Sequence, residues 1–158
     1  MERLRTRRVM GFSLIELLVV IAIILIIMGM AIPQLTDAKM RALELGALKA
    51  ISTIHTAEAQ YQSQYGRYAS TLAELGPPAT GASSAAGAGL ISGGLASGQK
   101  SGYKYSLQPT DVGYTISANP VAFNNTGKRT FYSDQSLITH QNSTAEPASA
   151  DSPEVDPK

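Results

Sequence analysis

The sequence predicts an α+β fold in which one long N-terminal helix packs against a small antiparallel sheet. Three patterns support this prediction. An almost unbroken apolar run covers residues 12–32, and an amphipathic helical pattern follows it as far as residue 65. Alternating, strand-like segments begin after residue 102. The 125 residues after Pro33 are partly low in complexity, so they have room for one small core.

Composition and charge exclude several other classes of protein. The chain has no Cys, so neither a disulfide framework nor a cysteine metal site is possible. Its net charge is +1, and residues 1–11 alone hold four arginines and one glutamate. Subtracting that local +3 leaves −2 for the remaining chain. The basic charge therefore belongs to the N-terminus, and no nucleic-acid partner is expected.

Residues 12–32 form a candidate membrane helix. A helix of this length spans roughly 31 Å, close to the thickness of a bilayer core. The preceding arginines predict that the N-terminus lies in the cytoplasm and that the rest of the chain is exported. Glu16 is the one charged residue of the run. A charge near the bilayer centre costs on the order of 2.5–3.5 kcal/mol, so it usually has a partner or a function.

Two ordinary interpretations of this segment compete. In the first, the segment is a secretory signal peptide cut after Ala31, which would release a soluble binding module beginning at Ile32. The apolar run is longer than the roughly 7–15 residues typical of such peptides. In the second, the segment is a plain membrane anchor, which explains its length and the arginines but leaves Glu16 unexplained.

The stretch GFSLIELLVVIAIILIIMGMAIP, residues 11–33, resembles the N-terminus of type IV pilins and of the pseudopilins of type II secretion. In that family a prepilin peptidase cuts after a Gly that ends a basic leader. The new N-terminal residue is then methylated on its amine, and a Glu follows four positions later. Gly11, Phe12 and Glu16 match these three positions, and Pro33 falls where the family commonly has a proline.

The resemblance implies a mechanism for Glu16. Cleavage after Gly11 creates a charged amine on Phe12, which becomes the site of N-methylation. In the assembled helical filament of identical subunits, Glu16 would meet the N-terminal amine of a neighbour. Leaving either charge unpaired among apolar helices is costly, so the pair would help to select the axial register. A simpler alternative stays open, because Glu16 lies only four residues inside the run and can extend its side chain to the interface.

The helical pattern continues beyond the membrane segment. Between Gln34 and Tyr65, apolar residues recur every three or four positions, with charged and polar residues such as Glu44 placed between them as a solvated face. We therefore expect one continuous helix over 12–65, on the order of 80 Å long. The apolar residues expected to face the core are Met40, Leu43, Ala47, Ile51, Ile54, Ala57, Tyr61 and Tyr65.

The rest of the chain predicts a small sheet and a tail. Residues 66–76 fit a short second helix, and the Gly-, Ala- and Ser-rich residues 77–102 fit a surface loop with one small turn. From Gln141 onward the chain lacks an apolar period and holds three prolines, which predicts a disordered tail. Strands are expected over residues 103–107, 113–120, 129–134 and 136–140. The predicted organisation is a cleaved leader at 1–11, a membrane or filament-core helix at 12–33, a pilin-like globular domain at 34–140 and a tail at 141–158.

No catalytic or metal-binding pattern stands out. His55 and His140 lack the spacing of a metal site. The major pseudopilins bind calcium through an acidic loop, but Asp111 and Asp134 are the only carboxylates of the sheet region, too few for an ion that takes six to eight oxygens. We therefore predict no enzyme activity, no metal and no cofactor.

The sequence thus predicts a structural subunit of a type IV pilus-like filament, assembled by machinery in the inner membrane. A pseudopilin of type II secretion is the alternative within the family. The missing cysteine pair departs from the disulfide-closed loop of many pilins, and the YGRY segment at 65–68 favours pseudopilins, whereas the weak calcium loop does not. The subunit would cross the inner membrane once before assembly and would then lie in an extracellular or periplasmic filament.

Mass spectrometry and N-terminal sequencing of the mature protein test the processing prediction. We expect a chain that starts at Phe12 and carries about 14 Da of added methyl mass. A chain that starts at Ile32 would instead identify a soluble export, and the filament interpretation would be wrong.

Overall fold

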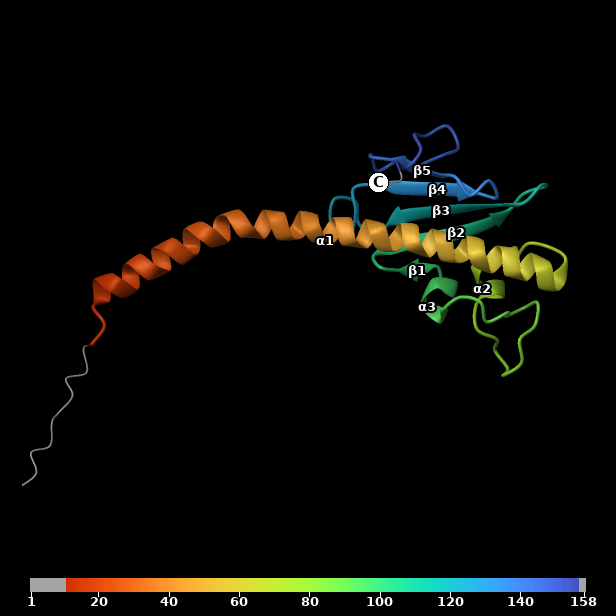
Figure 1. The fold of residues 1–158 in the computed structure, drawn as a ribbon, viewed down its shortest axis with the longest axis horizontal. Coiled ribbons are helices and arrows are strands. Elements are labelled where there is room, and N and C mark those ends of the chain that lie inside the picture. The colour runs from red at the N-terminus through yellow and green to blue at the C-terminus, as the bar shows by residue number, and fades with distance from the viewer. Residues whose placement is uncertain (1–10, 157–158) are drawn as a thin grey trace, which may run out of the picture. The chain divides into compact units, whose positions relative to one another are not determined.

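The chain forms two compact units, Met1–Asp37 and Ala38–Lys158, here called unit 1 and unit 2. The computed structural model describes residues 11–156, without the side chains of 31–33. The predicted leader therefore lies outside the described residues, apart from Gly11. Helix α1 (Leu14–Tyr65; Figure 1) contains most of the described residues of unit 1 and is the first element of unit 2. The prediction of one continuous helix is confirmed, with its start two residues later than expected.

Helix α1 ends at a glycine. The backbone of Gly66 has a φ of 73°, a left-handed conformation that favours glycine because it has no Cβ. Its N–H donates to the carbonyl of Gln62 at 2.8 Å, which satisfies one of the carbonyls left open at a helix end. The chain then turns back along the helix in unit 2.

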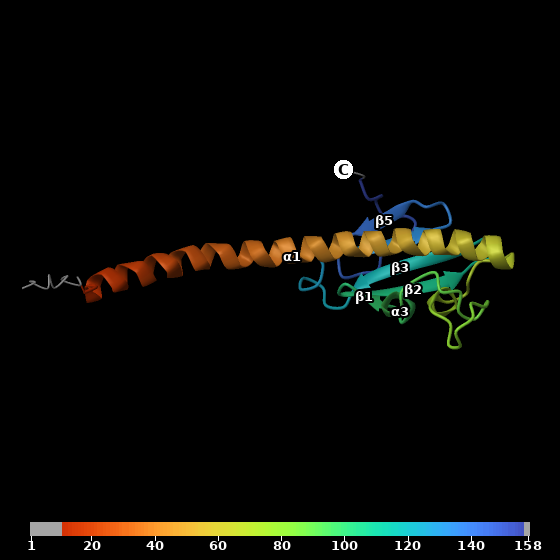
Figure 2. The same cartoon turned by 60° about the horizontal axis from the view of Figure 1, so that its bottom comes forward.

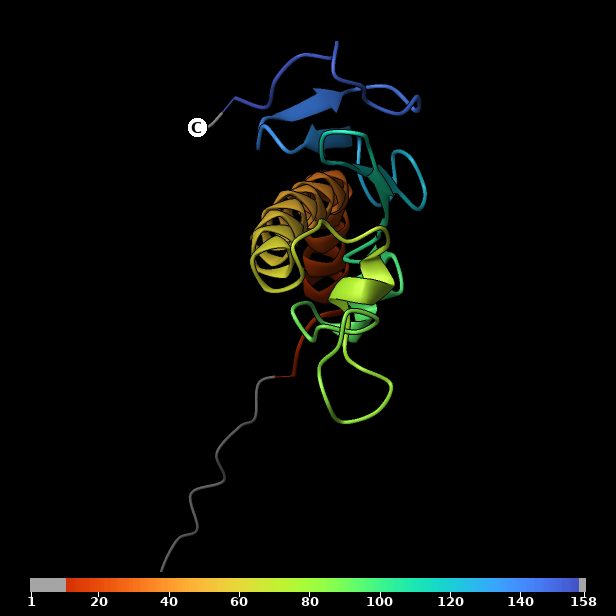
Figure 3. The ribbon, with the colours of Figure 1, turned by 90° about the vertical axis from the view of Figure 1, so that its right-hand side faces the viewer.

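Unit 2 contains a five-stranded antiparallel sheet whose spatial order follows the sequence. Its strands are β1 (Gln99–Lys100), β2 (Tyr103–Pro109), β3 (Tyr114–Pro120), β4 (Thr130–Asp134) and β5 (Thr139–Asn142). Within this unit, the helix lies across the sheet (Figure 2), and Figure 3 shows the strands curving around one side of it. Three of the predicted strands match β2, β3 and β4. The fourth, expected over 136–140, overlaps β5 only at Thr139 and His140, and β1 was not expected.

The core of unit 2 lies between the helix and the sheet. Alternate residues of β2 and β3 are buried, as the period of two in their sequences requires. The apolar stripe of the helix packs against them, and ten of the residues that form this core are Ala47, Ile51, Ile54, Ala57, Tyr61, Tyr103, Tyr105, Tyr114, Ile116 and Phe131. The apolar stripe of the helix and the sheet face opposite it are both buried, which confirms the expected α+β packing.

The segment between the helix and the sheet is more structured than its composition suggests. It contains two single-turn helices, α2 (Leu72–Leu75) and α3 (Gly93–Ala96). The prediction of a surface loop is wrong at Ile91 and Leu95, which are buried in the core. Backbone N–H groups of residues 88–91 donate to carbonyls of residues 74–76, so this loop is hydrogen-bonded along α2. Its small residues allow that close approach.

The C-terminal segment differs in part from the predicted tail. Gln141 belongs to β5, and beyond Asn142 the described chain forms no further helix or named strand. Residues 143–156 are nevertheless held against β5 by backbone hydrogen bonds. The N–H of Gln141 donates to Pro153 and the N–H of Val155 donates to Thr139, both at 2.8 Å. Backbone pairing needs no apolar period, which is why hydropathy did not indicate it.

A glycine-to-alanine pair tests how tightly this core is packed. A Cβ on Gly127 would overlap the hydroxyl of the fully buried Tyr103, which donates to the carbonyl of Arg129 at 2.9 Å. We expect Gly127→Ala to lower the free energy of unfolding by about 1–3 kcal/mol in a chemical denaturation experiment. Gly81→Ala, where no atom lies within 4 Å of the new Cβ, is the matched control. Equal stability of the two variants would contradict the described packing.

Candidate functional site

The candidate site begins where α1 starts. Gly11, Phe12 and Ser13 precede the helix, and the carbonyl of Ser13 accepts from the N–H groups of Glu16 at 3.1 Å and Leu17 at 3.2 Å. Gly11 is exposed with no atom within 4 Å of a built Cβ, and Phe12 is 78% exposed. The peptide bond between Gly11 and Phe12 therefore lies in accessible, non-helical chain, a conformation that a protease can bind.

Glu16 lies in the first turn of α1. The helix N-terminus carries a partial positive charge that stabilises a nearby carboxylate by about 0.3–1 kcal/mol. Within the described residues, the Glu16 side chain forms no hydrogen bond or ion pair and is exposed. The structure thus places Gly11, Phe12 and Glu16 together within one turn of the start of α1, and leaves the Glu16 carboxylate accessible to another molecule.

Between Leu14 and Met30, the surface of α1 is apolar on every side, with Glu16 as the one charged residue. The large apolar residues between Phe12 and Met30 are 44–81% exposed. The most hydropathic 18-residue window of α1 has a mean hydropathy of 3.0. Among the described residues, α1 alone is long and apolar enough, by length and composition, to cross a membrane. A helix that is hydrophobic all round is stable in a bilayer or in a bundle of similar helices.

Comparison with known proteins agrees with these features. The family model described as the prokaryotic N-terminal methylation motif matches residues 7–32. Neither a curated protein nor a solved structure matches the chain. The fold and the motif define a protein with an apolar N-terminal helix that carries a methylation motif, and with a small α+β domain. This motif is the hallmark of type IV pilins and pseudopilins, which implies processing by a prepilin peptidase and assembly by membrane machinery.

In unit 2, hydrogen bonds among His55, Tyr114 and Ser133 join α1 to the sheet. His55 Nδ1 lies 2.7 Å from the hydroxyl of Tyr114, and His55 Nε2 lies 2.8 Å from Oγ of Ser133. Ser133 donates its own hydrogen to the carbonyl of Ile138 at 2.7 Å, so His55 Nε2 must donate to Ser133 and Nδ1 must accept from Tyr114. A serine activated as a nucleophile needs the opposite arrangement, in which the imidazole accepts the hydroxyl proton. The contact therefore serves packing.

Sequence reasoning missed the burial of two carboxylates on α1. Glu44, expected on the solvated face, is 4% exposed, and Glu58 is fully buried. Glu44 accepts from the N–H of Lys128 at 2.7 Å and forms an ion pair with Arg129 at 2.8 Å. The spacing of buried positions did contain the signal, because Glu44 and Glu58 continue the period set by Ala47, Ile51 and Ile54.

The remaining candidate residues, Asp134 and the aromatic residues of the YGRY segment, make contacts within the fold. Asp134 accepts from the N–H of Ser136 at 2.9 Å, which caps the turn between β4 and β5. The side-chain hydroxyl of Ser136 and, to a smaller extent, this backbone hydrogen bond lower the pKa of Asp134. The described residues contain no group of three or more His, Cys, Asp or Glu side chains placed to hold a metal ion. The aromatic residues of the YGRY segment pack on neighbours, since Tyr65 contacts Tyr61 and Tyr68 contacts Tyr114.

Replacing His55 tests whether its hydrogen bonds to Tyr114 and Ser133 stabilise the packing of α1 against the sheet. We expect His55→Phe to lower the free energy of unfolding by about 1–3 kcal/mol, because the buried hydroxyls of Tyr114 and Ser133 lose a partner. Thermal denaturation followed by circular dichroism measures the change. Thr53→Ala, on the exposed side of the same helix, should change stability by at most about 0.5 kcal/mol. A His55→Phe variant as stable as the control would show that the contact contributes nothing.

Proposed function

We propose that this chain is a structural subunit of a type IV pilus-like filament. The observation that carries the proposal is the arrangement at the start of α1, where an accessible Gly11–Phe12 bond and the Glu16 carboxylate precede a helix that is apolar all round. Cleavage after Gly11 and methylation of the Phe12 amine would prepare the subunit. The role is structural and requires no reaction catalysed by the chain itself.

Assembly would exchange one apolar environment for another. Before assembly, the subunit lies in the inner membrane with its N-terminus in the cytoplasm, as the arginine-rich leader favours. In the filament, the exposed side chains of unit 1 would pack against those of neighbouring subunits. Since lipid and helix bundle are similarly apolar, burial alone does not specify one axial position. A Glu16 carboxylate paired with the Phe12 amine of a neighbour would supply that specificity, because an unpaired charge in the bundle is costly.

A pseudopilin of type II secretion is the second candidate function. The methylation motif is common to both classes, and the YGRY segment that ends α1 favours the pseudopilins. The two functions differ in what a cell without the protein loses. Loss of surface filaments supports the pilus, whereas loss of an exported protein with surface filaments intact supports the pseudopilin.

Substitution of Glu16 tests the assembly mechanism. We expect Glu16→Ala and Glu16→Gln to reach the membrane fraction at normal levels and to reduce the sheared-filament yield at least about tenfold, a loss of pairing of roughly 1.4 kcal/mol or more per subunit. Ile24→Leu, a volume-conserving change within the same helix, should assemble normally. Immunoblots of both fractions and electron microscopy provide the measurement. Normal filaments from Glu16→Ala would show that the register mechanism is wrong, and they would leave the family assignment unaffected.

A further inference from the structure

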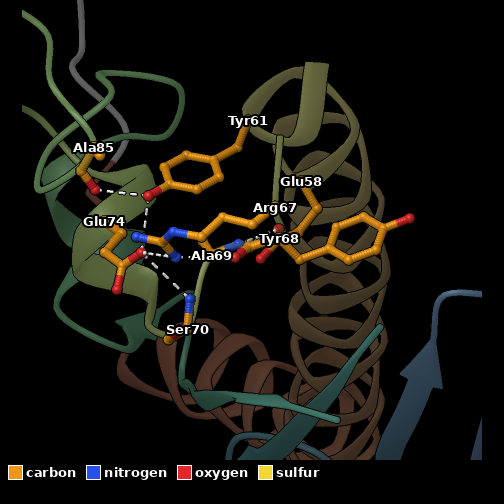
Figure 4. Close-up of polar contacts among 8 residues, drawn as sticks. All are labelled: Glu58, Tyr61, Arg67, Tyr68, Ala69, Ser70, Glu74 and Ala85. Atoms are coloured by element: carbon orange, nitrogen blue, oxygen red, sulfur yellow. Dashed lines mark hydrogen bonds and ion pairs between the residues drawn. The ribbon is translucent and has the colours of Figure 1, made fainter. Parts of the chain in front are cut away.

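Unit 2 buries a carboxylate that the proposed filament role does not use. Glu58 has no exposed surface and lies on the side of α1 that faces the returning chain. Its Oε2 accepts from the N–H of Ala69 at 2.9 Å (Figure 4). Its Oε1 is buried without a hydrogen-bond partner among the described residues. The only direct polar contact of this carboxylate within the described chain is therefore with the segment that follows the helix.

The charged groups around Glu58 are already paired with one another. From the returning segment, Arg67 forms an ion pair with Glu74 at 2.9 Å. Glu74 also accepts from the hydroxyl of Tyr61 on α1 at 2.9 Å, as Figure 4 shows. From the sheet, Tyr114 faces the same region and is held by His55, which precedes Glu58 by about one helical turn. No cation forms an ion pair with Glu58 within residues 11–156.

These surroundings favour the neutral carboxyl. The pKa of Glu58 is raised to about 7, chiefly by burial and further by the negative charge of Glu74. The N–H bond from Ala69 and the positive charge of Arg67 offset only part of this rise. A carboxylate with one bare oxygen in an apolar core is costly, and the protein avoids that cost by keeping the proton or by admitting water.

We propose that Glu58 is a pH-sensitive switch that controls the docking of residues 66–76 on α1. With the carboxyl neutral, the docked segment buries no charge, and the N–H of Ala69 still has an acceptor in Oε2. Ionisation favours states in which the segment moves away and water reaches Oε1. The segment includes Leu72 and Leu75, which are buried in the core, so its release loosens the part of unit 2 that contains α2.

The direction of the pH effect follows from linkage. The folded-state pKa of Glu58 lies above its ordinary value of 4.5, so the docked state binds more protons than the open one. The stabilisation is complete below pH 4.5 and is lost as the pH rises through about 7. His55 acts in the opposite direction. Burial lowers its pKa below 6.5, so its contribution is lost as the pH falls. Docking is therefore strongest in mildly acidic solution.

Hydrogen exchange on the full mature chain in detergent micelles tests the switch. We expect the exchange rates of the Ala69 and Leu72 amides, corrected for intrinsic pH dependence, to rise at least about tenfold between pH 5 and pH 7. Glu58→Gln retains a carbonyl oxygen to accept from Ala69 but cannot ionise, so its corrected rates should not rise with pH. Glu74→Gln is the matched control. Although burial opposes them, hydrogen bonds from Tyr61 and Arg67 lower the pKa of Glu74, so that carboxylate is ionised throughout this range. Because its charge adds to the pKa rise of Glu58, the increase in exchange should persist in Glu74→Gln but be smaller.

Two results would overturn the proposal. One is a corrected exchange rate that does not change between pH 5 and pH 7 in the wild-type chain, or that changes equally in Glu58→Gln. The other comes from a carbon-13 NMR titration of the Glu58 carboxyl in the wild-type chain, which needs no variant to fold. A midpoint near 7 supports the switch, and a midpoint below about 5 excludes it.

Discussion

One helix must suit two different environments, and the rest of the structure depends on how its side chains meet that constraint. In unit 1, α1 is apolar around its whole circumference, which suits lipid or a bundle of like helices. In unit 2, only one stripe of the helix is apolar, so a single sheet is enough to cover it. The short antiparallel meander, with strands in sequence order, is a simple way to supply that cover from a short chain.

The stripe also contains two carboxylates, and the protein treats them differently. Glu44 is fully engaged, because a backbone N–H and the guanidinium of Arg129 bind both of its oxygens and tie the helix to the start of β4. This pair fixes the position of the sheet along the helix. Glu58 receives one N–H and no cation within the described chain, so its charge depends on the surroundings. Glu44 thus makes a fully paired contact, whereas in the proposed switch the contact of Glu58 depends on pH.

The sequence predicted most of the elements because their signals are local. The period of α1, its end at Gly66 and the alternation in β2 and β3 need no knowledge of distant residues. What it did not predict depends on contacts across the chain. The burial of Glu44 requires Arg129, which lies 85 positions later, and the ordering of residues 143–156 requires backbone pairing with β5. At the start of α1 the prediction came from the spacing of Gly11, Phe12 and Glu16, whose proposed partners belong to other molecules.

The backbone pairing of the C-terminal segment has a consequence for the protein before assembly. An uncovered edge strand offers a row of free N–H and C=O groups to which another chain can add. The bonds of Val155 to Thr139 and of Gln141 to Pro153, with the bridge between His140 and Glu154, occupy that row along β5. Residues 143–156 therefore limit the pairing of a second chain with β5, in the way that a covered edge protects a sheet from aggregation.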